Sequence, residues 1–170
     1  AHKILYMDFE KHRPASQGSY RSPIFKGLDA QSLKEFTDMM MLASKHLKAS
    51  DKIVAAQARA MITESKQHYV STSGANNLQE YVFIANNFSA TAQNGSEIQT
   101  RSDHGGVAKC LQMGMDFYDL NEIASRCTEV GEQALQLIEA PNCPSDKMDL
   151  ILMPDQMLLQ IHESIGHPLE

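Results

Sequence analysis

Apolar residues recur at helical spacing in the first part of the chain. From Leu33 onward they stand at offsets of 0, 3, 7, 10 and 14 residues: Leu33, Phe36, Met40, Ala43 and Leu47. This spacing predicts an amphipathic helix that buries one side, and Asp29 or Ser32 can cap its start. Within it, Met39-Met40-Met41 is interpreted as packing rather than as a metal site, because no second sulfur cluster is near in sequence.

A second helical stripe follows Asp119. Its apolar positions are Ile123, Cys127, Val130, Ala134 and Leu137. Glu122, three residues after Asp119, completes a capping-box pattern, and Pro141 ends the helix. Because Cys127 lies on the apolar stripe, we expect it to be a buried structural thiol, whereas Cys143, in a Pro-Asn-Cys-Pro turn, should be more exposed.

Short apolar runs between the two helices predict strands. The first runs from Ile53 to Glu64, and Ser65-Lys66 is expected to form a tight turn into a second over residues 68–73. After turn residues at Gly74 to Asn77, a longer strand is predicted from Gln79 to Gln93.

Asn94-Gly95 then gives a two-residue hairpin signal that leads into a strand over residues 96–101. The result is an antiparallel meander. Polar residues alternate along the strands of this meander, so one face of the sheet should contact solvent or a segment outside this chain. His68 and His104 are interpreted as surface or hydrogen-bonded histidines rather than ligands, and residues 105–118 fit either an edge strand or an irregular loop.

Two amphipathic helices and an antiparallel meander predict an α+β fold with helices covering one face of the sheet. We divide the chain into an irregular leading segment (1–28), an α+β domain (29–153) and a motif helix (154–170). The apolar run from Met148 to Met153 predicts a buried strand that carries the chain to the motif helix.

Composition narrows the class of protein. The 170 residues are 42% hydrophobic and 21% charged, which fits one compact domain or most of one. Three cysteines without a disulfide framework favour a reducing compartment. With no basic and apolar leader and no apolar run near the roughly 18 residues of a membrane span, we expect a cytoplasmic protein that does not contact a membrane.

The charge balance argues against nucleic acid as a direct partner. The formal net charge is −6, and no cluster of Lys and Arg is interleaved with aromatic residues. Affinity for a phosphate backbone comes chiefly from clustered cations. We therefore expect no direct binding of nucleic acid.

The final stretch of the chain carries the candidate chemistry. His162, Glu163 and His167 lie directly after an apolar run. Zinc prefers neutral imidazole ligands and a hydrolytic site has about three protein ligands, so His162 and His167 form a partial site. Glu163 follows the first histidine, as the general base does in the H-E-x-x-H helix. The alternative is an unrelated set of polar residues at the end of an amphipathic helix.

The five-residue spacing of the histidines requires an irregular helix. In a straight helix, side chains five residues apart point roughly 140° apart. Gly166 and Pro168 favour a loosened end, and a π-type turn would return both positions to nearly one face. We predict a helix from about Asp155 to Ile165 with His167 at a distorted C-terminal turn.

This region resembles the TldD/PmbA family, metal-dependent peptidases also described as modulators of DNA gyrase and as peptide-maturation proteins. The specific match is the segment from Met157 to Glu170, with its apolar run before H-E-x-x-G-H, a short spacer and Glu. The preceding segment 148–155, the Gly18-Ser-Tyr-Arg-Ser-Pro23 stretch and the polar strands over 52–101 are similar to the central part of that family.

The resemblance implies a TldD-type zinc (Zn2+) peptidase. Zinc would be held by His162 and His167, with Glu163 as general base, and the substrates would be flexible peptides. The chain would form a dimer with itself or with a PmbA-type subunit, and any association with gyrase would be indirect.

The resemblance also implies an interior fragment of a longer chain, because the family extends beyond both Ala1 and Glu170. The family's third zinc ligand is a cysteine far downstream, for which this chain has no position. Glu170 could turn toward the metal, whereas Cys110, Cys127 and Cys143 lack zinc-ligand spacing. We therefore expect the isolated 170 residues to be inactive.

Two function classes follow. The first is the zinc peptidase. The second is a non-catalytic scaffold or peptide-binding subunit that pairs with a partner and presents a sheet edge to extended peptides.

Overall fold

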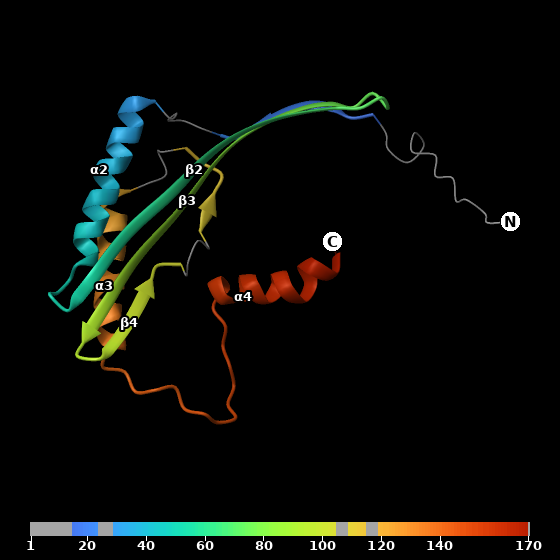
Figure 1. Cartoon of the computed structure of the whole chain (residues 1–170). Coiled ribbons are helices and arrows are strands. Elements are labelled where there is room, and N and C mark those ends of the chain that lie inside the picture. The colour runs from blue at the N-terminus through green and yellow to red at the C-terminus, as the bar shows by residue number, and fades with distance from the viewer. Residues whose placement is uncertain (1–14, 24–28, 105–108, 115–118, 170) are drawn as a thin grey trace.

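Two long antiparallel strands form the centre of the molecule (Figure 1). In the computed structural model, which describes residues 15–23, 29–104, 109–114 and 119–169, β2 spans Ile53–Val70 and β3 spans Asn76–Asn94. Ala55 pairs with Thr91 and Val70 with Asn76, so the two strands stay in register for almost their whole length. The predicted strand over 79–93 is therefore confirmed.

Three shorter strands pair with β3 along its other edge. β4 (Glu97–Ser102) and β5 (Cys110–Leu111) are antiparallel to it, and β1 (Gln17–Arg21) is parallel to it. The meander β2–β3–β4 is thus confirmed, while β1 makes the five-stranded sheet mixed. This parallel strand lies within the segment 1–28 that we expected to be irregular. Of the ambiguous stretch 105–118, residues 110 and 111 form an edge strand.

The expected turn at Ser65-Lys66 is wrong. These residues continue β2 and pair with Tyr81 and Glu80, and Lys66 Nζ lies 2.8 Å from a Glu80 carboxylate oxygen. The chain reverses instead after Val70, where Gly74 has a φ of 89°, a left-handed conformation that glycine adopts without steric cost.

The hairpin signal at Asn94-Gly95 is confirmed with a shift of one residue. Asn94 pairs with Glu97, so the loop consists of Gly95 and Ser96. Gly95 has a φ of 61° at the first loop position, as glycine does in type II′ hairpin turns.

Two helices cover one face of the sheet (Figure 1). α2 spans Ala30–Leu47 and begins at Asp29, whose carboxylate accepts a hydrogen bond of 2.7 Å from Ser32 N–H. α3 spans Leu120–Leu137 and begins at Asp119, whose carboxylate accepts from Asn121 and Glu122 N–H. Each carboxylate satisfies helix-end donors that have no partner within the helix.

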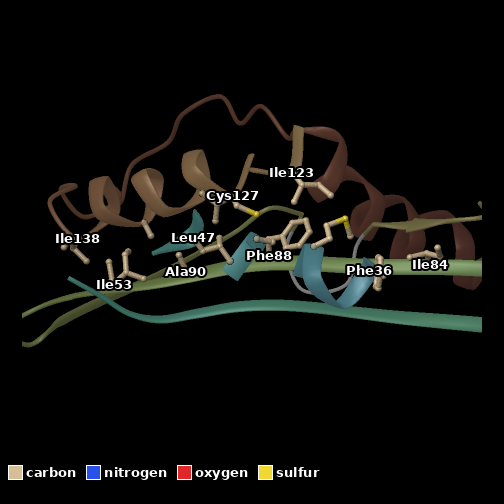
Figure 2. Packing of buried hydrophobic residues seen from close by; sticks show 14 residues of the cluster. Phe36, Leu47, Ile53, Ile84, Phe88, Ala90, Ile123, Cys127 and Ile138 are labelled. Atoms are coloured by element: carbon tan, nitrogen blue, oxygen red, sulfur yellow. The ribbon is translucent and has the colours of Figure 1, made fainter. Parts of the chain in front are cut away.

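The hydrophobic core lies between these helices and the sheet (Figure 2). It joins Phe36 and Leu47 of α2, Cys127 of α3 and the side chains of β3 that point toward the helices, such as Phe88. Met39 is buried, so its packing role is confirmed, whereas Met41 is exposed. The sheet and its two helices therefore confirm the α+β fold, while the three-part domain division remains a prediction.

The segment after α3 departs from the prediction. Residues 141–153 form no strand, and Leu150 and Ile151 are 77% and 87% exposed. The buried strand predicted at Met148 to Met153 is therefore wrong: apolar sequence alone provides no neighbouring strand to pair with. The segment leads to α4 (Pro154–Ile161), which Figure 1 shows on the side of the sheet opposite α2 and α3.

No helix in the described ranges is long and apolar enough to cross a membrane.

Candidate metal centre

The motif begins where α4 changes its helical pitch. Pro154 occupies the first turn of α4, where its missing N–H costs nothing, and Met153 O accepts from the N–H groups of Gln156 and Met157. After Ile161 the chain continues as a π-turn over His162–Gly166 and a 3₁₀ turn over His167–Leu169. The predicted distorted helix end is confirmed.

The π-turn brings the two histidines together. His167 N–H donates to His162 O, the i to i−5 bond that defines this wider turn. The imidazole rings lie with centroids 4.5 Å apart at an interplanar angle of 69°. A straight helix would point these side chains to different sides, so the extra residue in the turn is what allows both rings to approach one ion.

Glu163 lies beside the same pair. Its Oε2 is 3.8 Å from His167 Nε2, and one ligand atom from each of the three side chains falls within 4.8 Å of the others. Two imidazole nitrogens and a carboxylate oxygen are donors that zinc and related divalent metals accept. The donor set therefore fits a metal ion, with the two imidazoles as ligands and the carboxylate as ligand or neighbour.

Gly166 contributes less than expected. Positive φ values among the described glycines occur at Gly74 and Gly95, not at Gly166, and the flanking His167 has ordinary helical angles of −57° and −41°. A Cβ added at Gly166 would lie 3.7 Å from His162 Nδ1, an ordinary contact. The π-turn is therefore built from near-helical backbone and does not require glycine.

The motif lies on the surface. His162, Glu163 and His167 are all exposed, and so are apolar residues of the same segment, among them Leu158, Leu159 and Ile165. A hydrolytic metal site normally excludes bulk water, which strengthens its electrostatic interactions. The described residues thus supply candidate metal ligands, but none of them shields these ligands from solvent.

Other residues considered for metal binding lie elsewhere. Cys127 is fully buried among apolar neighbours, as predicted, and this burial raises the pKa of its thiol to about 12. Cys143 is exposed, as predicted, and Cys110 is exposed as well. His68 shares a hydrogen bond of 2.7 Å with Asn76 Oδ1. Glu170, the possible local ligand, lies outside the described residues.

A buried ionic cluster was not predicted from the sequence. Asp103 is 4% exposed, forms an ion pair with Arg126 Nε and lies with its second carboxylate oxygen 2.9 Å from His104 Nε2. Arg126 also binds Glu129 at 2.7 Å, and its pKa is raised, chiefly by the hydrogen bond to Asp103. Because Asp103 follows the end of β4 and Arg126 lies 23 positions later in α3, no local pattern could reveal the pair.

Comparison with known proteins gives a distant relative. A protein of Methanothermobacter thermautotrophicus named metalloprotease is 25% identical over 126 residues, which cover 74% of this chain and 27% of that protein. The chain thus spans about a quarter of the length of the relative it matches. The sequence matches no family model.

Proposed function

We propose that this chain carries part of the active site of a metal-dependent peptidase. The observation that carries the proposal is the π-turn that gathers His162, Glu163 and His167 within 4.8 Å of one another. The distant similarity to a protein named metalloprotease supports the same reaction class. We further propose zinc as the metal and a TldD-type enzyme that cleaves flexible peptides.

Each residue has a distinct task in this proposal. His162 and His167 hold the ion through neutral imidazole nitrogens. When bound, the ion polarises the peptide carbonyl and makes water a stronger acid. The Glu163 carboxylate takes the proton from the attacking water and delivers it to the departing amine nitrogen. A carboxylate can perform both transfers because it alternates between its charged and neutral forms.

The site needs a further ligand if Glu163 serves as the base. Catalytic zinc sites hold the ion with about three protein ligands, and the cluster then supplies His162 and His167 alone. We propose that the intact protein completes the site with a residue outside the described ones. For this reason we expect the isolated 170 residues to bind zinc weakly and to be inactive.

Replacing Glu163 with Gln tests the catalytic proposal. Glutamine keeps the size of the side chain but cannot take up a proton, so kcat/KM of the intact protein on an unstructured peptide should fall by roughly 10²–10⁴. Zinc content, measured by elemental analysis, should stay near that of the unchanged protein. Glu132→Gln, an exposed glutamate on α3, is the matched control and should leave cleavage unchanged.

Replacing either histidine tests the metal proposal separately. His162→Ala and His167→Ala should each remove most of the zinc, because each deletes one of the two neighbouring imidazoles that would hold the ion. Intact protein that holds no stoichiometric metal would exclude the metallopeptidase. It would favour the alternative, a non-catalytic peptide-binding subunit.

A further inference from the structure

The outer edge of β2 is a strand edge whose backbone groups alternate in direction. On β3, Phe88 O accepts a hydrogen bond from Asp103 N–H. The backbone N–H and C=O groups of even-numbered residues of β3 therefore point toward β4. The backbone groups of odd-numbered residues of β3 therefore form the hydrogen bonds with β2. Because Tyr81 pairs with Ser65, the residues of β2 that form these hydrogen bonds are also odd-numbered. The N–H and C=O groups of even-numbered residues of β2 consequently point to the outer edge.

Helix α2 occupies only the first part of that edge. Ser44 Oγ donates to Ala56 O at 3.4 Å, which caps one outward carbonyl and agrees with the assigned direction. Farther along, β2 and β3 extend past both helices as a long arm (Figure 1). Along β2, Met61, Tyr69 and Val70 are 63%, 55% and 64% exposed.

Among the residues that the structure describes, no strand pairs with this edge of β2. A long strand edge with exposed apolar side chains is a surface that proteins normally cover or pair. We propose that residues 60–70 of β2 pair with the same residues of a second copy, antiparallel, with Ser65 at the two-fold axis. The two sheets then become one continuous sheet. This inference uses none of the residues of the candidate metal centre and holds whether or not the protein is a peptidase.

Charge complementarity selects this register. With Ser65 on the axis, Glu64 lies opposite the partner's Lys66, and symmetry repeats the pair. Moving the axis by one residue would place Glu64 opposite the partner's Glu64, or Lys66 opposite the partner's Lys66. Moving it by two leaves both charged residues opposite side chains that carry no opposite charge. Opposite charges across a strand pair stabilise it, and like charges destabilise it.

The apolar residues agree with the same register. Met61 lies opposite the partner's Tyr69 on the sheet face away from the helices, and Ala60 lies opposite the partner's Val70 on the other face. Thioether and aromatic contacts of this kind are favourable. Even-numbered residues oppose even-numbered residues, so the outward N–H and C=O groups of the two copies meet as a hydrogen-bonded ladder.

A charge exchange between two variants tests the proposal. Glu64→Lys alone places two lysines opposite each other at each pair. Lys66→Glu alone places two glutamates there and also removes the ion pair of Lys66 with Glu80 of its own chain. Each variant should dimerise about tenfold more weakly than the unchanged chain, because two favourable cross-strand pairs become repulsive. An equimolar mixture of the two variants restores opposite charges at both pairs, so it should form heterodimers close to the original affinity.

Sedimentation equilibrium on the full chain measures these affinities. Glu97→Lys on β4, an exposed glutamate with the same charge change, is the matched control and should dimerise normally. The mixture also controls for folding, because a variant that merely unfolds cannot be rescued by another. The proposal would be overturned if the unchanged chain is monomeric, or if the mixture of Glu64→Lys and Lys66→Glu stays monomeric. It would also be overturned if the edge of β2 binds added extended peptides but no second copy of the chain.

A disulfide at the axis tests the register independently. Ser65 and its partner form a non-hydrogen-bonded pair, in which Cα atoms lie about 4.5 Å apart, within the span of a disulfide. In a background of Cys110→Ser and Cys143→Ser, Ser65→Cys should form a covalent dimer under mild oxidation. Thr63→Cys alone should not, but mixed with Gln67→Cys it should, because those positions oppose each other. This register would be contradicted if Ser65→Cys, Thr63→Cys and Gln67→Cys, each tested by itself, crosslink equally.

Discussion

At the scale of single residues, burial decides what a polar or reactive side chain can do. Asp103 and Cys127 both lie in the interior, but Asp103 is charged and paired with Arg126 while Cys127 is surrounded by apolar groups. A buried charge is tolerable only with a partner, whereas a buried thiol is stable when it stays protonated. The stability of the fold therefore depends on the charged partner of Asp103 and on the apolar neighbours that keep the Cys127 thiol protonated.

Replacing Asp103 with Asn should destabilise the fold. The substitution removes the charge that faces Arg126 and His104, and breaking a buried pair usually costs about 3–5 kcal/mol. Because the Arg126 side chain is 36% exposed and keeps Glu129, we expect about 2 kcal/mol, measured by urea unfolding. Asp51→Asn, an exposed aspartate, is the control and should change stability little. An equal effect of both variants would contradict the assigned role of the pair.

Cys127 should be unreactive in the folded protein. Its thiol has a pKa raised to about 12, mainly by burial, and it is the thiolate that reacts. A disulfide reagent at neutral pH should modify the exposed Cys110 and Cys143 quickly and the third thiol only after unfolding.

The same shift sets the sign of a pH effect on stability. Cys127 holds its proton more tightly when folded than at the ordinary pKa of 9.0, so its contribution is fully present below pH 9 and is lost as the pH rises toward about 12. Cys127→Ala should lose less stability over this range than the unchanged chain, as measured by urea unfolding. An identical pH profile of the two proteins would show that the pKa of this thiol does not differ between the folded and unfolded states.

At the scale of elements, backbone proximity matters as much as side-chain pattern. Helices α2 and α3 approach closely where Gly131 faces the end of α2. The π-turn at His162–Gly166, in contrast, leaves space around its glycine. The space around each glycine is decided by the neighbouring element, which the local sequence does not specify.

A pair of glycine substitutions separates these two situations. Gly131→Ala would place its Cβ 2.5 Å from Leu47 O and 3.2 Å from Ala49 Cβ, so one helix must move. We expect a loss of about 1–3 kcal/mol in the free energy of unfolding, as for overpacked cores. Gly166→Ala, which meets only ordinary contacts, should keep both stability and metal content. A stable Gly131→Ala variant would indicate that the helices separate easily.

At the scale of the whole molecule, the candidate metal centre and the hydrophobic core are separate. The core joins α2, α3 and the sheet, whereas His162, Glu163 and His167 are exposed on a helix on the opposite side of the sheet. A bound ion stabilises the structure to which it is attached. Here that structure is the motif helix rather than the core.

Metal removal should therefore leave the core intact. After treatment of the 170-residue chain with a chelator, we expect the main thermal transition to shift by less than about 2 °C, which corresponds to less than about 0.5 kcal/mol for a domain of this size. Circular dichroism during heating measures this. A large fall in Tm would show that the motif packs against the core when metal is present.

The sequence by itself determined the elements whose causes are local. Helical spacing located α2 and α3, and glycine located the hairpin between β3 and β4. Asp119 marked the start of α3, whereas for α2 the sequence left Asp29 and Ser32 as alternatives and the structure has Asp29. The five-residue spacing of His162 and His167 likewise required a widened turn if both were to meet one ion, and that turn is present. Each of these features depends on residues a few positions apart.

Only the tertiary structure decided features that depend on distant partners. Ser65 and Lys66 continue a strand because Tyr81 and Glu80 lie opposite them, and β1 joins the sheet because β3 offers a free edge. The apolar run at Met148 to Met153 stays exposed because no described strand lies beside it. Pairing and burial require a second segment of chain in contact, and its position in space is absent from any local pattern.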